Sequence, residues 1–327
     1  MKTRLLDYLV CPECKSELKL EIREKLGQEV ISGSLNCGAC RSEYSISGGI
    51  PRMLKKSQGK VAARTARNFG YSWSNVWKLS PTDQIEADGY FSGLIQKSDF
   101  KDRVVLDAGC GNGRITYFIG RYNAKEVIGF DFSNSVEAAF ENTKDLNNVH
   151  IVQADIYNLP LKQQYDLVYS IGVLHHLPEP EEGFKQLSRL LTGRGQIFAW
   201  VYGREGNKLY LKLFEPLRKL TSRLPLAVNK VIAIILAAMI WLIIKLVYLP
   251  VAKMGAVERL PLGRYLLFFH KLGFRQFRAT VFDKMIPPIS NYYTKEEFGR
   301  WFENQDLKDI RILPRTNNSW RGLGGRS

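Results

Sequence analysis

Four cysteines near the amino terminus have the spacing of metal ligands. They form two C-x-x-C pairs, which are Cys11, Cys14, Cys37 and Cys40. Two such turns can point four thiolates at one tetrahedral zinc ion. Two disulfides or free thiols are the alternatives, but the pattern suits a metal site in a reducing compartment better. We expect zinc to supply folding free energy here, because the two predicted strands, 17–22 and 29–35, cannot bury a core alone.

A glycine-rich turn follows an apolar run that ends at Asp107. Its spacing is G-x-G-x-G, and its residues are Gly109, Cys110, Gly111, Asn112 and Gly113. Glycines at the start of a helix let backbone approach a ligand closely. A nicotinamide or flavin fingerprint needs its third glycine at position 114, where the chain has Arg114, so this class is disfavoured. A plain strand-to-helix connection is the alternative interpretation.

Acidic residues come at the ends of three successive predicted strands, as Asp107, Asp131 and Asp155. We expect them at one edge of a sheet, because the carboxyl ends of parallel strands lie side by side. Asp131 can accept hydrogen bonds from ribose hydroxyls, and Asp155 can accept one from an adenine amino group while Ile156 packs on the ring. Each acid alone would suit a solvated strand end. Three in series predict a nucleotide pocket.

Two histidines, His175 and His176, follow the fourth predicted strand. A histidine can remove a proton at near-neutral pH, so either one is a candidate base for an acceptor group. Packing or capping of the loop is the alternative for each, and we favour His176 at the site. Two apolar residues beside these strand ends, Phe132 and Ile171, complete the candidate cofactor residues.

The elements that must position these residues alternate between strand and helix. The apolar periodicity predicts strands over 103–107, 126–131, 149–154, 165–170 and 196–202 and helices over 113–122, 134–144 and 181–191. A capping box at Thr294–Glu297 begins a last helix, and two strands follow over 308–314 and 319–325. This order predicts an α/β fold with a doubly wound, Rossmann-like sheet.

Composition and charge narrow the class of protein. The 327 residues are 45% hydrophobic and carry a net charge of +15, which excludes a disordered or disulfide-dense chain and favours anionic partners. The first ten residues lack a secretory signal, so we expect a cytoplasmic protein.

About ninety residues separate the fifth strand from the capping box, and this insert is basic and partly hydrophobic. It contains the apolar stretch Val231–Ala252, with Trp241 and Tyr248 at positions that suit a headgroup boundary. A single membrane crossing would split the sheet. We therefore expect an element that lies against an anionic membrane surface at the inner face, with a buried lid helix as the alternative.

The glycine turn, the three acids and the run 165–177 together resemble the class I S-adenosylmethionine-dependent methyltransferases, in the branch with quinone and other small-molecule enzymes. The resemblance covers about 100–202 and resumes near 294. It implies that S-adenosylmethionine is the cofactor and that the turn 109–113 holds its methionine moiety, Asp131 its ribose, and Asp155 with Ile156 its adenine.

The amino-terminal segment is similar to the zinc-ribbon family of tRNA-methyltransferase activator proteins. The similarity rests on 5–10 before the first cysteine pair and 44–54 after the second. Members of that family are small partners that stabilise or activate methyltransferases, so the resemblance implies a helper module.

These expectations divide the chain into a zinc ribbon (1–55), a linker with an aromatic cover around 69–77 (56–100), a cofactor-binding core (101–202), a lid-like insert (203–293) and a closing helix with strands (294–327). We expect a methyltransferase that acts at oxygen or carbon of a hydrophobic or lipid-linked small molecule, with nucleic acid a less favoured partner. The alternative is an RNA methyltransferase with a zinc-finger recognition module. The sequence leaves the oligomeric state open.

Overall fold

The five strands expected between 103 and 202 form a parallel sheet in the computed structural model, which describes residues 1–55, 68, 70, 79 and 81–326. In spatial order they are β7 (Val149–Ala154), β6 (Glu126–Asp131), β5 (Val104–Ala108), β8 (Tyr165–Ile171) and β9 (Leu191–Tyr202). Their runs are apolar because both faces of such a sheet are covered. The expected linker 56–67 and most of the expected aromatic cover lie outside the described residues.

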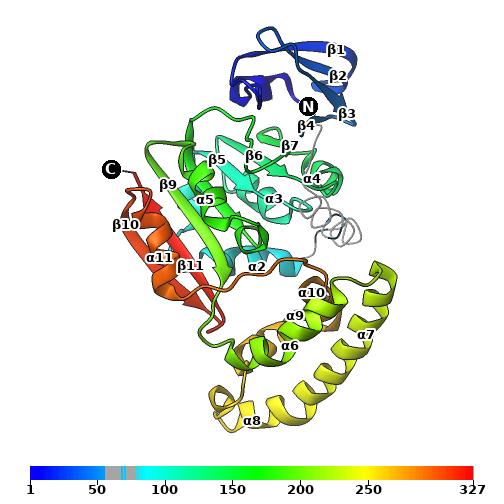
Figure 1. The fold of residues 1–327 in the computed structure, drawn as a ribbon, viewed down its shortest axis with the longest axis vertical. Helices are drawn as coiled ribbons and strands as arrows, with labels where there is room; N and C mark the ends of the chain where they lie inside the picture. The colour runs from blue at the N-terminus through cyan, green and yellow to red at the C-terminus, as the bar shows by residue number, and fades with distance from the viewer. Residues whose placement is uncertain (56–67, 69, 71–78, 80, 327) are drawn as a thin grey trace.

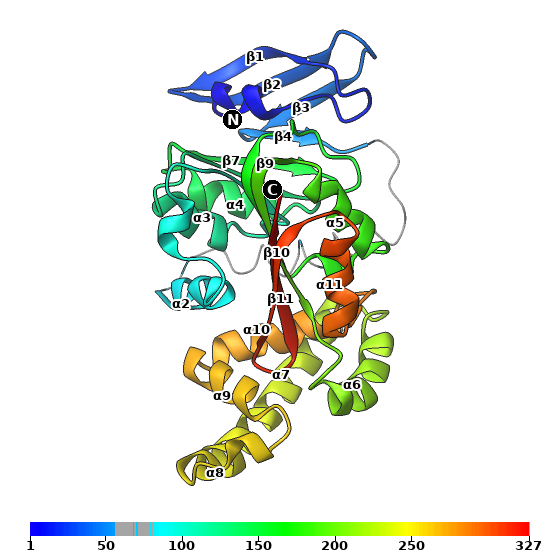
Figure 2. The same cartoon turned by 90° about the vertical axis from the view of Figure 1, so that its left-hand side faces the viewer.

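Helices cover both faces of this sheet, as Figure 2 shows. On one face lie α2 (Pro81–Phe91), α3 (Arg114–Arg121) and α4 (Val136–Thr143). On the other face lie α5 (Pro180–Ser188) and α11 (Lys295–Glu303). Each face has its own core of buried apolar side chains. The doubly wound fold class is therefore confirmed.

The carboxyl-terminal elements complete the sheet beyond β9. The predicted capping box is present at the start of α11, where the side chains of Thr294 and Glu297 each accept a hydrogen bond from the other residue's backbone N–H. Two antiparallel strands, β10 (Lys308–Arg315) and β11 (Ser319–Gly325), follow. The pairing of β11 with β9 places Ser319 opposite Tyr202.

The amino-terminal module extends the same sheet at its opposite edge (Figure 1). Its strands are β1 (Leu18–Leu26), β2 (Glu29–Cys37), β3 (Glu43–Ser47) and β4 (Ile50–Met53), of which the sequence predicted the first two. Strand β4 pairs in parallel with β7 through Arg52 opposite Gln153 and Met53 opposite Ala154. The module thus covers an otherwise open strand edge, and the sheet has 11 strands among the residues that the structure describes.

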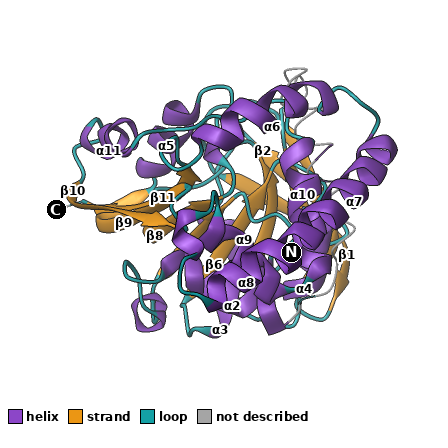
Figure 3. Cartoon of the chain, turned by 90° about the horizontal axis from the view of Figure 1, so that it is seen from below, coloured by secondary structure: helices purple, strands orange, loops and turns teal. Residues whose placement is uncertain are grey.

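The insert forms a group of helices at the carboxyl-terminal ends of the parallel strands, and Figure 3 views the molecule from this side. They are α6 (Lys208–Thr221), α7 (Leu226–Ile243), a π-helical turn (Ile244–Tyr248), α8 (Leu249–Lys253), α9 (Gly263–Leu272) and α10 (Phe274–Met285). We call residues 208–285 the helical arm. A separate core, built around Ala237, Phe269 and Phe277, holds α7, α9 and α10 together.

Candidate active site

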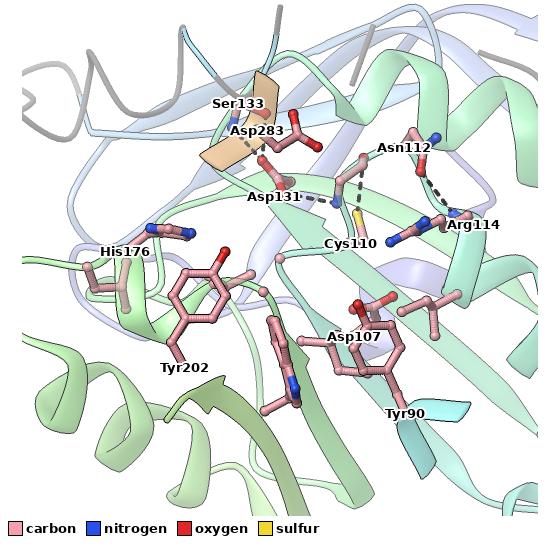
Figure 4. Close-up of a pocket in the computed structure, with 18 of the residues that line it drawn as sticks. Tyr90, Asp107, Cys110, Asn112, Arg114, Asp131, Ser133, His176, Tyr202 and Asp283 are labelled. Atoms are coloured by element: carbon pink, nitrogen blue, oxygen red, sulfur yellow. Dashed lines mark hydrogen bonds between the residues drawn. The ribbon is translucent and has the colours of Figure 1, made fainter. Parts of the chain in front are cut away.

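A cavity of about 270 Å³ opens at the carboxyl ends of the parallel strands. The predicted cofactor residues that line it are Asp107, Gly109, Cys110, Gly111, Asp131, Phe132, Asp155, Ile156 and Ile171. Gly113 does not line it. Figure 4 shows Asp131 between two groups of side chains, with His176 and Tyr202 on one side and Asn112 and Arg114 on the other. The structure therefore brings the acid series and the glycine turn to one place.

The glycine turn after β5 has a shape that only glycine supports. Gly109 has a φ of +86°, and a Cβ there would lie 2.1 Å from Cγ2 of Val173. Gly113 has a φ of +76°, and its Cβ would lie 2.9 Å from the backbone of Ala139 in α4. Gly113 thus allows α3 and α4 to pack closely, whereas Gly109 keeps backbone at the cavity wall.

Asp131 at the end of β6 is held by the loops around it. Its carboxylate accepts hydrogen bonds from the backbone N–H of Gly111 at 3.0 Å and from the N–H and hydroxyl of Ser133 at 2.8 and 2.7 Å. These bonds fix the side chain and tie the glycine turn to the next strand. A carboxylate has about four lone-pair sites, so one stays free here, and a second opens when the Ser133 hydroxyl donates instead to the hydroxyl of Ser135, 2.7 Å away.

Asp107 is buried beneath the glycine turn, with 3% of its surface exposed. Burial raises its pKa to about 7, although the hydroxyls of Thr116 and Tyr169 donate to it at 2.6 and 2.7 Å. The loss of hydration outweighs these two hydrogen bonds. Asp107 therefore anchors β5 to α3 and β8 and contributes a wall of the cavity.

Asp155 and Ile156 follow β7 at the next position along the sheet edge. Burial also raises the pKa of Asp155, whose carboxylate accepts from the backbone N–H of Tyr157 at 3.0 Å. Ile156 is 5% exposed. A hydrogen-bond acceptor next to a buried apolar side chain suits an adenine ring, which has a polar edge and two apolar faces.

The two histidines have different surroundings. His176 lines the cavity, and its Nδ1 lies 2.7 Å from the carbonyl oxygen of Ile289, which fixes Nδ1 as the donor and leaves the lone pair on Nε2. Burial lowers its pKa to about 4, so the ring is neutral at pH 7. His175 does not line the cavity, and it packs 3.9 Å from the ring centre of Tyr202.

One wall of the cavity was not predicted from the sequence. It combines Tyr202 at the end of β9 with Tyr265 of α9 and Lys284 of α10. The ammonium of Lys284 lies 4.5 Å from the ring centre of Tyr202 and 5.6 Å from that of Tyr265, and burial lowers its pKa to about 8. The sequence signal was only the length and position of the insert. This aromatic wall lies on the His176 side of the cavity.

A buried ion pair lies on the opposite side of the cavity. The guanidinium of Arg114, the residue at the position of the missing third glycine, contacts the carboxylate of Glu86 in α2 at 2.7 Å. Nothing local in the sequence indicated this pairing, because the two residues belong to separate helices.

The four amino-terminal cysteines come together as predicted. Their sulfur atoms all lie within 4.8 Å of one another, with Cys11 3.5 Å from Cys40 and Cys14 3.4 Å from Cys37. These separations exceed an S–S bond and are close to the roughly 3.8 Å between ligands of a tetrahedral zinc ion with Zn–S bonds of about 2.3 Å. The cluster fits a closed zinc site, and it matches a zinc-ribbon-like module.

Two family models match the chain at these sites. Residues 106–199 match a methyltransferase domain, and residues 2–49 match the Trm112p-like proteins. The first match spans the glycine turn, the acids and both histidines. The second spans all four cysteines.

Curated relatives match parts of the chain. A tRNA U34 carboxymethyltransferase of Pseudoalteromonas atlantica is 33% identical over 111 residues, which are 33% of this chain and 34% of that protein. The enzyme of the same name from Cellvibrio japonicus is 33% identical over 145 residues, 42% of each chain. The matched part of this chain thus spans less than half the length of these relatives.

Among solved structures, magnesium protoporphyrin IX methyltransferase of Synechocystis PCC 6803 aligns over 82% of this chain and 100% of that chain. The two have 17% identity and a TM-score of 0.48.

These names correct two of the expectations. A hydrophobic or lipid-linked small molecule as acceptor, with nucleic acid less favoured, is contradicted by curated relatives that are named for tRNA. The misleading signal was the apolar insert, which lies outside the matched residues 106–199. The RNA alternative is the better supported one. The chain thus combines a methyltransferase domain with a Trm112p-like domain.

Proposed function

We propose that the chain is an S-adenosylmethionine-dependent methyltransferase and that it methylates a base of tRNA. The observation that carries the proposal is the similarity of part of the chain to enzymes named tRNA U34 carboxymethyltransferase. Asp131, Asp155 and His176, which line the cavity, lie within the matched methyltransferase domain. The net charge of +15 supports it, because cationic side chains attract a phosphate backbone. The cytoplasm, where tRNA is modified, is the matching location.

The acid edge of the cavity is the proposed cofactor side. Asp131 would accept from the ribose hydroxyls, and Asp155 with Ile156 would hold the adenine. The glycine turn 109–111 would place backbone beside the methionine moiety. The bound cofactor supplies an activated sulfonium methyl group, so the chain's own residues need mainly to align the acceptor and exclude water.

His176 is the proposed proton acceptor. The Nδ1–H of its ring donates to the carbonyl of Ile289, so Nε2 carries a lone pair and no hydrogen. That lone pair would face the group that is methylated. Burial keeps the ring neutral at physiological pH. Such a weak base suits an acceptor proton that is lost as the new bond to the methyl carbon forms.

The aromatic wall is the proposed base-binding side. An enzyme that modifies a base must take it out of its stack, and flat aromatic rings compensate for the lost stacking. Tyr202, Tyr265 and Phe269 provide rings on this wall, and Lys284 provides a cation next to two of them. The helical arm would therefore form the acceptor half of the site.

The test is transfer of a labelled methyl group from S-adenosylmethionine to bulk tRNA. We expect label in nuclease-sensitive material and a heavier nucleoside by mass spectrometry. Tyr265→Ala should raise KM for tRNA without changing affinity for the cofactor, whereas Tyr265→Phe, which keeps the ring, should behave like the wild type. Label that enters only the organic phase of a cell extract would refute the proposal.

A further inference from the structure

The helical arm carries an apolar surface that nothing in the described part of the chain covers. In the helix Leu226–Lys253, only 17% of an 18-residue apolar window is buried. Its outward side chains follow a helical spacing and are 43–67% exposed, at Val228, Val231, Ile235, Met239, Leu242 and Leu246. We call these six residues the outer stripe. Figure 1 shows α7 on the outer side of the arm.

We propose that the outer stripe docks the enzyme on an anionic membrane surface without crossing it. By length and composition the helix Leu226–Lys253 is able to span a bilayer. However, the insert leaves and re-enters the sheet at one place, where the N–H of Arg204 donates to the carbonyl of Tyr293 at 2.8 Å and Gly203 pairs with Tyr293. A single crossing would separate these residues, so the helix lies along the surface.

The charges around the stripe favour anionic lipid. The segment between Glu215 and Glu258 contains basic residues and no acidic one. Lys230, Lys245 and Lys253 are exposed on or beside α7. Each cation near an anionic surface strengthens binding, while the apolar side chains enter the headgroup boundary.

The same charges argue against two other occupants. RNA would neutralise the lysines but would leave the apolar stripe in water. Two copies packed stripe to stripe would bring their cations together without any acidic partner from this segment.

Trp241 and Tyr248 were expected at a headgroup boundary, but both pack within the arm. The ring of Trp241 stacks on that of His270 with 4.9 Å between the ring centres, and the hydroxyl of Tyr248 donates to the carbonyl of Pro261 at 2.9 Å. Docking therefore rests on the aliphatic stripe and the lysines.

Membrane contact is compatible with an accessible active site. The outer stripe contributes no residue to the cavity, whereas the inner side of the same arm contributes Tyr265, Phe269 and Lys284. Ala237, a buried small residue of α7, belongs to the arm's own core. Docking is thus independent of which acceptor the cavity takes.

The experiment is flotation of the full-length protein with vesicles of phosphatidylcholine, with or without phosphatidylglycerol. We expect flotation that requires the anionic lipid and weakens with salt. The variant Leu242→Gln with Leu246→Gln should bind at least about tenfold more weakly, since each buried leucine supplies more than the roughly 1.4 kcal/mol that a factor of ten requires. Leu26→Gln, which changes an equally apolar residue that is 74% exposed on β1, is the matched control and should bind like the wild type.

Thermal unfolding and methyl transfer to tRNA are measured on the same variants. Both should stay unchanged, so loss of flotation cannot be assigned to misfolding or to an error in the proposed function. Wild-type protein that fails to float with either vesicle would overturn the proposal. Flotation of the double variant equal to that of the wild type would also overturn it. So would a wild-type protein that sediments as a dimer when the double variant sediments as a monomer.

Discussion

Asp107→Asn should change how stability depends on pH. In the folded chain the pKa of Asp107 is raised from 3.8 to about 7, because the carboxyl is buried. Between these values the unfolded chain releases the proton while the folded chain keeps it, so the free energy of unfolding falls as pH rises. The shift corresponds to a loss of ~4 kcal/mol once pH exceeds 7, of which ~3 kcal/mol falls between pH 5 and 8. Asparagine keeps an oxygen for the hydroxyls of Thr116 and Tyr169 but does not ionise.

Urea unfolding of both proteins at pH 5 and pH 8, without cofactor, measures this effect. The buried histidines also contribute to the pH dependence, because they titrate near 6.5 in the unfolded chain, but they are the same in both proteins and cancel in the difference. We expect the variant to gain about 3 kcal/mol relative to the wild type on going from pH 5 to pH 8. Parallel pH dependence of the two proteins would refute the claim that burial controls the ionisation of Asp107.

Three further predictions concern the metal cluster, the proposed cofactor side and the proposed proton acceptor. Metal analysis should find one zinc ion per chain, and Cys37→Ser should abolish it and lower the urea midpoint of the amino-terminal module; zinc-free wild-type protein would contradict this. Asp131→Ala should weaken S-adenosylmethionine binding by roughly 1–3 kcal/mol in calorimetry, through lost hydrogen bonds to ribose, whereas Asp131→Asn should lose less; an unchanged Kd would remove Asp131 from the site. The pH profile of kcat should show no inflection near 6.5, because burial lowers the pKa of His176 to about 4, and an inflection that His176→Gln removes would contradict the assignment.

The meeting of the acids and the glycine turn at one sheet edge could be predicted because its signals are local. Each strand is a short apolar run followed at once by a turn or an acid, so the sequence itself places Asp107, Asp131 and Asp155 at strand ends. Parallel topology then brings them to one edge. The same reasoning predicted the cysteine cluster, since two C-x-x-C turns leave little freedom for four sulfur atoms.

The remaining features depend on contacts between distant segments. The pairing of β4 with β7 rests on two residue pairs separated by about a hundred positions, and β4 itself contains a proline that weakens its strand signal. The aromatic wall needs α9 and α10 to fold back over the sheet. No periodicity in the sequence places Lys284 beside Tyr202.

The apolar insert shows how a correct local signal led to a wrong acceptor. The stretch around Val231–Ala252 is exposed and hydrophobic, as its composition suggested. However, its outer stripe lies apart from the cavity, so it carries no information about what is methylated.

A crystal structure with S-adenosylhomocysteine bound is the most direct test of the proposed active site. The account predicts ribose hydroxyls within hydrogen-bond distance of the Asp131 carboxylate, the adenine against Ile156 with its amino group toward Asp155, and the sulfur directed toward the wall with His176 and Tyr202. Binding of the cofactor elsewhere, or with its sulfur turned away from that wall, would contradict it.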